Sequence, residues 1–237
     1  MHQLTVTIPV DKTTMAMHTA WPEGNGPFPA VVAIMHAGGV DTFMQAMVTR
    51  LVEAGYFVAA PDLYHRLDVR QGDMMDRLKQ LRDPEVTEDV NATVDYLRDH
   101  PLIDNTRLGI LGFCMGGRVA YLLAELNPHL RAAVAYYGGN IMVPWGDGTS
   151  PFSQSHDLNC PLLFHFGADD TNPSPADMHR LEQELTRLGK PHEFYAYEGA
   201  GHAFMNYKNP QRYRENASEL SWPRTVEFLA RQLGENV

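Results

Sequence analysis

The stretch Ile110-Leu111-Gly112-Phe113-Cys114-Met115-Gly116-Gly117 decides the fold of this chain. A buried apolar run leads into it, a helical pattern follows it, and glycines stand two residues before and two residues after Cys114. This G-x-C-x-G-G pattern is typical of a nucleophile elbow, a sharp turn between strand and helix that exposes a reactive side chain. Side chains at Gly112 and Gly116 would collide with the neighbouring strand and helix. We therefore expect Cys114 to begin a helix at the end of a buried strand.

The expected turn gives Cys114 a chemical role. The positive end of the following helix lowers the pKa of a thiol and stabilises developing negative charge. The backbone N–H of Met115 then becomes one donor of an oxyanion hole. Free cysteines are often simply buried, so a structural thiol is the alternative, but the complete strand–turn–helix pattern favours a nucleophile. Cys160 lies in Leu158-Asn159-Cys160-Pro161, without a glycine turn, and we expect it to be structural.

A thiol nucleophile needs a base, and the base needs a group that orients it. Nucleophile elbows of this kind are followed along the chain first by the acid and then by the histidine. Among eleven histidines, His202 stands in Glu198-Gly199-Ala200-Gly201-His202-Ala203-Phe204, directly after the last expected strand, and is the candidate base. Phe166-Gly167-Ala168-Asp169-Asp170 leaves the preceding strand. Either carboxylate could accept a hydrogen bond from His202, and spacing alone leaves the choice open.

Short apolar runs alternate with helical patterns along the rest of the chain. We expect strands at Leu4–Val10, Thr14–Thr19, Ala30–Met35, Tyr56–Ala60, Arg107–Phe113, Arg131–Tyr137, Pro161–Phe166 and Glu193–Tyr197. We expect helices at Phe43–Ala54, Glu85–Arg98, Gly116–Leu126, Pro175–Leu188 and Pro223–Leu233. This alternation predicts an α/β fold, a mostly parallel sheet of about seven or eight strands with helices on both faces, in one domain over residues 1–237.

Two stretches, Leu63–Pro84 and Gly138–Asn159, fit neither pattern. Both fall where a catalytic face would lie, so they either cover a pocket or form ordinary surface loops.

Composition excludes several classes of function. Acidic residues outnumber basic ones by 29 to 19, giving a net charge of −10, which argues against a nucleic-acid partner. The longest apolar runs are much shorter than the roughly 20 residues that cross a bilayer, and no secretory signal is visible. Two cysteines make no disulfide framework, so we expect a cytoplasmic protein. The histidines show no zinc-site spacing, and we expect neither a metal nor an organic cofactor.

The motifs together make the sequence resemble the dienelactone hydrolases (carboxymethylenebutenolidases), a family of α/β-hydrolases. The resemblance covers nearly the whole chain and rests on the elbow and on Ala59–Tyr64, Ala135–Gly138, Phe164–Gly167 and Gly201–Phe204. It implies the α/β-hydrolase fold and a catalytic triad of Cys114, Asp170 and His202. The family's Gly-x-x-Asp pattern falls on Gly167 and Asp170, which favours Asp170 over Asp169. Its second oxyanion donor falls on the backbone N–H of Ala37.

The sequence also departs from the family. Members that cleave dienelactone carry a Glu in the loop after the third strand, and here that loop reads Met35-His36-Ala37-Gly38-Gly39. They also carry an Arg four residues after the catalytic His, where this chain has Asn206. A second family Arg falls within Leu67–Arg82, where Arg70, Arg77 and Arg82 are candidates. We therefore expect neutral or broadly varied substrates, because an anion needs a positive partner in a cleft.

Four further residues are expected to line the pocket: His36, Tyr64, Trp145 and Phe204. His36 has an alternative role, in which loop carbonyls satisfy its ring, and Tyr64 and Trp145 have the alternative of simple packing.

The expected reaction is hydrolysis of a small-molecule ester or lactone through an acyl-enzyme on Cys114. Alternatives are hydrolysis of other activated electrophiles, such as thioesters, small peptides or phosphotriesters, and a non-catalytic ligand-binding role. The sequence leaves the oligomeric state open, with a homodimer among the alternatives.

Overall fold

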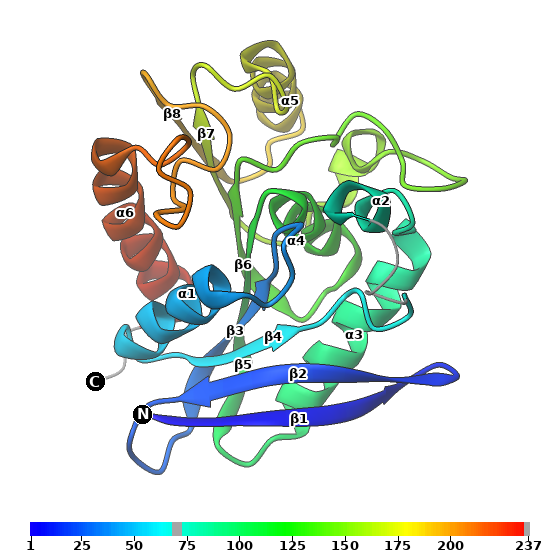
Figure 1. The fold of residues 1–237 in the computed structure, drawn as a ribbon, viewed down its shortest axis with the longest axis vertical. Helices are drawn as coiled ribbons and strands as arrows, with labels where there is room; N and C mark the ends of the chain where they lie inside the picture. The colour runs from blue at the N-terminus through cyan, green and yellow to red at the C-terminus, as the bar shows by residue number, and fades with distance from the viewer. Residues whose placement is uncertain (68–72, 235–237) are drawn as a thin grey trace.

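The computed structural model describes residues 1–67 and 73–234. They contain one eight-stranded sheet with the strand order β1-β2-β4-β3-β5-β6-β7-β8 (Figure 1). The strands are β1 His2–Val10, β2 Thr13–Trp21, β3 Phe28–Ile34, β4 Phe57–Pro61, β5 Ile103–Phe113, β6 Leu130–Tyr136, β7 Leu162–Gly167 and β8 His192–Tyr197. The pairs β1–β2 and β2–β4 are antiparallel, and every other pair is parallel. The expected α/β-hydrolase architecture is therefore confirmed.

Helices cover both faces of the sheet. They are α1 Thr42–Glu53, α2 Met74–Leu78, α3 Asp83–Asp99, α4 Met115–Leu126, α5 Pro175–Arg187 and α6 Glu215–Leu233, with a 3₁₀ helix, η1, at Pro151–Asp157. Figure 1 shows α1 and α6 on one face and α3 and α4 on the other. Strands β3 and β4 are buried along their whole length, as their continuous apolar runs predict for strands that are covered on both faces. No helix within the described residues is long and apolar enough to cross a membrane.

The last helix begins eight residues earlier than expected. We expected Pro223 to start it, because proline suits the first turn of a helix, but α6 starts at Glu215 and carries Pro223 inside. Packing explains the difference. Ser218 and Ser221 are buried, and the guanidinium of Arg50 lies 4.2 Å from the ring centre of Trp222. These contacts hold the first two turns although Pro223 offers no N–H.

Parallel strands bring four loops to one edge of the sheet. The loop after β3 carries Ala37, the turn after β5 carries Cys114, the loop after β7 carries Asp170, and the loop after β8 carries His202. Because β3, β5, β6, β7 and β8 run in one direction, the segments that follow them meet at their carboxyl ends. The candidate residues are therefore brought together by strand direction.

Candidate active site

Cys114 sits on a strained turn between β5 and α4. Its backbone angles are φ 57° and ψ −120°, in a region that side chains rarely adopt. A Cβ atom at Gly112 would lie 2.0 Å from the carbonyl oxygen of Gly116, and one at Gly116 would lie 2.5 Å from that of Ile34. The close packing of strand, turn and helix therefore excludes side chains at both glycines, as the sequence pattern predicts.

Three side chains form a hydrogen-bonded chain at this edge of the sheet. The Cys114 sulfur lies 3.0 Å from Nε2 of His202, and Nδ1 of His202 lies 2.9 Å from Oδ2 of Asp170. Asp170 is buried, and its Oδ1 accepts a hydrogen bond from the N–H of Asn172 at 2.9 Å. The neighbouring carboxylate of Asp169 is exposed to solvent. The geometry thus pairs His202 with Asp170, the carboxylate that the family pattern favours.

The protonation of Cys114 and His202 is shifted in opposite directions. Burial by itself would raise the pKa of the Cys114 thiol, but the hydrogen bond and charge of His202 outweigh burial and lower it. Burial likewise opposes a charged His202, but Asp170 and Cys114 raise its pKa above the ordinary value. Burial raises the pKa of Cys160 to about 12. Cys114 and His202 therefore favour a thiolate–imidazolium pair, whereas Cys160 stays a protonated thiol.

Two backbone N–H groups face the Cys114 sulfur. They belong to Met115, the first residue of α4, and to Ala37, and both lower the pKa of the thiol. The loop that carries Ala37 is closed by a hydrogen bond from the N–H of Gly39 to the carbonyl oxygen of His36 at 2.9 Å. Two backbone donors beside one sulfur are the kind of groups from which an oxyanion hole is built.

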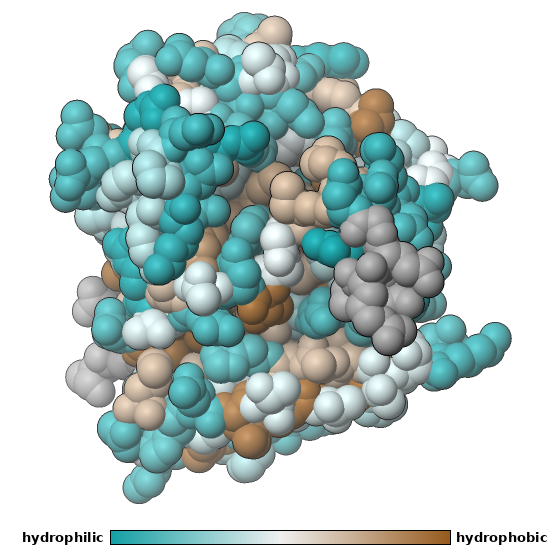
Figure 2. All heavy atoms as spheres, in the orientation of Figure 1, coloured by the Kyte–Doolittle hydropathy of each residue, from teal (hydrophilic) through white to brown (hydrophobic). Residues whose placement is uncertain are grey.

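Two cavities of about 330 Å³ each open beside Cys114. Both are lined by Ala37, Met74, Cys114, His202 and Arg212. The first extends toward an apolar wall, formed by Met75, Leu78 and Trp145. The second extends toward four polar side chains, His36, Asp41, Asn206 and Asn209. Figure 2 shows apolar surface in the middle of the face on which α1 and α2 lie.

The two unassigned stretches of the sequence contribute to these walls. Leu63–Pro84 contains α2, and Gly138–Asn159 contains η1 and supplies Gly139, Asn140 and Trp145. Both stretches therefore cover a pocket, the first of the two alternatives for them.

Trp145 lines the first cavity and His36 lines the second. The guanidinium of Arg118 lies 4.0 Å from the ring centre of Trp145 and fixes that ring from behind. Nδ1 of His36 accepts a hydrogen bond from the N–H of Gly38 at 3.3 Å, and its Nε2 lies 3.0 Å from Oδ2 of Asp41. The loop Met35–Gly39 has no carboxylate of its own, but Asp41 brings one to its histidine. This contact is not apparent from the loop sequence.

Phe204 and Tyr64 lie elsewhere than we expected. Phe204 is fully buried and packs edge-on against Tyr137, with ring centres 5.2 Å apart, so it supports the site from the core and lines neither cavity. Tyr64 is also buried and lines neither cavity at Cys114. Its hydroxyl donates instead to the carbonyl oxygen of Ala37 at 3.0 Å. Sequence position put both residues near the site, but the direction of their side chains depends on the packed fold.

Arg212 is a cavity residue that sequence reasoning missed. It lines both cavities, although it stands ten residues after His202. Among the earlier candidates, Arg82 donates to the carbonyl oxygens of Lys79 and Leu81, and Arg77 lies over the ring of Tyr64. Arg70 lies outside the described residues. The loop after β8 therefore brings a cation, Arg212, to the cleft. The absence of an arginine at position 206 alone does not make the cleft free of positive charge. Within the described residues, no cluster of three or more His, Cys, Asp or Glu side chains is placed to hold a metal ion.

Comparison with known proteins identifies the family. The model of the dienelactone hydrolase family matches residues 15–233. The chain belongs to this family, and it is a hydrolase of ester or lactone bonds. It is 32% identical to a Methylorubrum extorquens protein, provisionally named a carboxymethylenebutenolidase, over 97% of this chain and 80% of the relative. It is 31% identical to the carboxymethylenebutenolidase of Rhodococcus opacus, over 92% of this chain and 86% of the relative.

A solved structure agrees with the assignment. It is the crystal structure of a Klebsiella pneumoniae protein that is provisionally named a dienelactone hydrolase. The TM-score is 0.89, at 28% identity, over 97% of this chain and 98% of the other.

Proposed function

We propose that this dienelactone hydrolase relative cleaves an ester or lactone through an acyl-enzyme on Cys114, with His202 as acid and base and Asp170 as the group that orients His202. The observation that carries the proposal is the unbroken hydrogen-bonded chain from the Cys114 sulfur through His202 to Asp170, at 3.0 and 2.9 Å. It lies beside two cavities that are large enough for a small substrate.

In the first half of the reaction, the Cys114 thiolate attacks the carbonyl carbon and the electron pair of the double bond moves to the oxygen. The N–H groups of Ala37 and Met115 stabilise the resulting oxyanion. When the carbonyl re-forms, the bond to the alcohol oxygen breaks and protonated His202 donates its proton to that oxygen. The products of this half are a thioester on Cys114 and, for an ester, a free alcohol. In a lactone the alcohol stays attached to the acyl group.

In the second half, neutral His202 removes a proton from a water molecule, and the hydroxide attacks the thioester carbonyl. The same two N–H groups hold the second oxyanion. Collapse of this intermediate expels the Cys114 thiolate and releases the carboxylic acid, which restores the thiolate–imidazolium pair. Asp170 keeps Nδ1 of His202 protonated, so that Nε2 faces the reacting atoms throughout.

The two cysteines provide the direct test. Cys114→Ala should abolish hydrolysis of a chromogenic short-chain aryl ester while the protein stays folded, because no other described side chain in the cavities is an activated nucleophile. Cys160→Ala is the matched control and should retain turnover within about twofold, because Cys160 is a protonated thiol in the core. Substantial turnover by Cys114→Ala would refute the proposal.

We also propose that the site favours uncharged esters or lactones. The wall of Met75, Leu78 and Trp145 suits an apolar group, and the second cavity offers the amides of Asn206 and Asn209. Arg212 is exposed, and Asp41 lines the same second cavity, so an anion bound there would lie near a carboxylate as well as a guanidinium.

The measurement is kcat/KM for an uncharged aryl ester and for a carboxylate-bearing ester of similar size, in the wild type and in Arg212→Gln. The neutral ester should be preferred in both proteins. A tenfold preference of the wild type for the anion, about 1.4 kcal/mol, that Arg212→Gln abolishes would show that Arg212 selects anions and that this prediction is wrong.

A further inference from the structure

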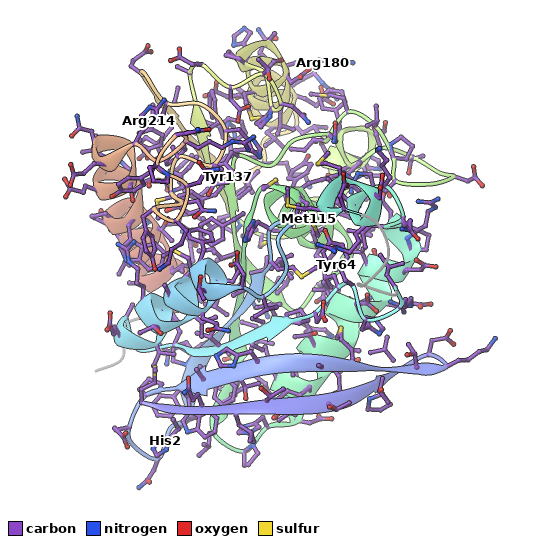
Figure 3. All side chains as sticks on the ribbon, in the orientation of Figure 1. His2, Tyr64, Met115, Tyr137, Arg180 and Arg214 are labelled. Atoms are coloured by element: carbon purple, nitrogen blue, oxygen red, sulfur yellow. The ribbon has the colours of Figure 1, made fainter. Side chains whose placement is uncertain are left out.

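Tyr64 occupies an unusual position behind the oxyanion hole. It follows β4, and its backbone N–H donates to Oδ1 of Asp62 at 3.0 Å, which fixes the turn that presents it. Its hydroxyl donates to the carbonyl oxygen of Ala37 at 3.0 Å and lies 3.5 Å from the sulfur of Met115. Figure 3 shows Tyr64 and Met115 side by side near the centre of the molecule. One buried hydroxyl therefore contacts the two residues whose N–H groups face Cys114.

The backbone around Ala37 needs such a contact. The peptide unit before Ala37 is held by the loop itself, because the carbonyl oxygen of His36 accepts from the N–H of Gly39 at 2.9 Å. The peptide unit after Ala37 leads into Gly38 and Gly39, which have no side chains, and its N–H donates to Nδ1 of His36 at 3.3 Å. Its carbonyl oxygen is the atom to which Tyr64 donates. Both peptide units that flank the Ala37 Cα are thus fixed, the first by the loop and the second by His36 together with Tyr64.

We propose that Tyr64 is a positioning residue that aligns the Ala37 and Met115 donors of the oxyanion hole. The inference rests on the proposed function of Cys114, because the two donors matter only if a tetrahedral intermediate forms beside that sulfur. Donors that are already aimed at the developing charge stabilise the transition state without reorganisation, and small displacements weaken them. Tyr64 acts through the Ala37 carbonyl oxygen and the Met115 side chain, since it lines neither cavity at Cys114.

Two features of the surroundings suit this role. Burial raises the pKa of Tyr64 to about 12, so that the hydroxyl keeps its proton and remains a donor over the working pH range. The guanidinium of Arg77 lies 5.5 Å from the ring centre of Tyr64 and supports the ring from the other side. The ring and the hydroxyl are therefore held in one orientation against Ala37 and Met115.

The test is Tyr64→Phe, which removes only the hydroxyl. We expect kcat for an aryl ester to fall tenfold or more while KM changes less than twofold, because the lost alignment affects the transition state and leaves substrate binding alone. A trifluoromethyl ketone gives a second measurement. The Cys114 thiolate adds to its carbonyl carbon, and the electron pair moves to the oxygen, which stays in the oxyanion hole. The inhibition constant of this ketone should rise by the same factor by which kcat falls.

Tyr56→Phe is the matched control. Tyr56 is equally buried and stands at the opposite end of β4, and burial also raises its pKa to about 12. Removal of the Tyr56 hydroxyl measures the general cost of losing a buried hydroxyl, and Tyr56→Phe should keep kcat within twofold of the wild type. The inference is overturned if folded Tyr64→Phe keeps wild-type kcat and inhibitor affinity, or if Tyr56→Phe loses as much of both. In either case an inactive Cys114→Ala would leave the proposed function standing.

Discussion

At the scale of single residues, Asp169 and Asp170 are adjacent carboxylates with different surroundings. Asp170 is buried and lies 2.9 Å from Nδ1 of His202, while Asp169 faces solvent. Asp170→Asn should lower kcat/KM by several orders of magnitude, because an amide no longer holds the tautomer that leaves Nε2 free for Cys114. Asp169→Asn should change kcat/KM less than about threefold. Steady-state kinetics on one aryl ester measures both, and the opposite ranking would show that the wrong carboxylate has been assigned.

The sequence predicts some residues of the site well because their signals are local. Cys114 is marked by a pattern of glycines around one turn, and His202 by glycines directly after a strand. Arg212 has no comparable signal, because a loop of ten residues folds back to bring it to the cleft. The sequence also cannot show that Tyr64 points at the Ala37 carbonyl oxygen. That contact depends on how the loops after β3 and β4 pack against each other.

At the scale of elements, the elbow between β5 and α4 has no room for a side chain. A Cβ atom at Gly112 would lie 2.0 Å from the backbone oxygen of Gly116, whereas one at Gly109 would meet chiefly the flexible end of Leu233 at 3.0 Å. Gly112→Ala should therefore cost about 3 kcal/mol of stability or more, and Gly109→Ala, on the same strand, about 1 kcal/mol. Thermal or urea unfolding measures both. Equal destabilisation of the two variants would contradict the described packing of the turn.

The boundaries of α6 show where sequence patterns fail at this scale. Proline normally ends or begins a helix, so Pro223 predicted the start of the last helix. The true start at Glu215 depends on contacts that the two preceding turns make with distant segments, such as Arg50 of α1 over Trp222. The strands were easier to predict, because a continuous apolar run reports burial on both faces directly. A helix whose first turns are held by tertiary packing has no such local signal.

At the scale of the whole molecule, one buried acid makes stability depend on pH. Glu125 of α4 is 2% exposed, and burial, with the charge of Asp157 adding to it, raises its pKa from 4.5 to about 9. Between these two values the folded protein keeps a proton that the unfolded chain has lost, so stability falls as pH rises through this window. At pH 7, which is 2.5 units above 4.5, the linked cost is about 3 kcal/mol.

Glu125→Gln removes this titration while keeping the shape of the side chain. The variant should melt several degrees higher than the wild type at pH 8. The difference should be much smaller at pH 5, because pH 5 lies only 0.5 units above the pKa of 4.5 of the unfolded chain and little stability is linked to the proton there. Thermal melting at the two pH values measures the effect. The same difference in melting temperature at both pH values would mean that Glu125 does not titrate in this window.

The central claim for the molecule is that Cys114 carries the acyl group during turnover. The most direct measurement is mass spectrometry of the protein after acid quenching of its reaction with a slowly deacylating aryl ester, followed by peptide mapping. We predict a mass increase of one acyl group on the peptide that contains Cys114, no such increase in Cys114→Ala, and an unchanged increase in Cys160→Ala. Turnover by the wild type with the acyl group on another residue, together with an active Cys114→Ala, would contradict the account.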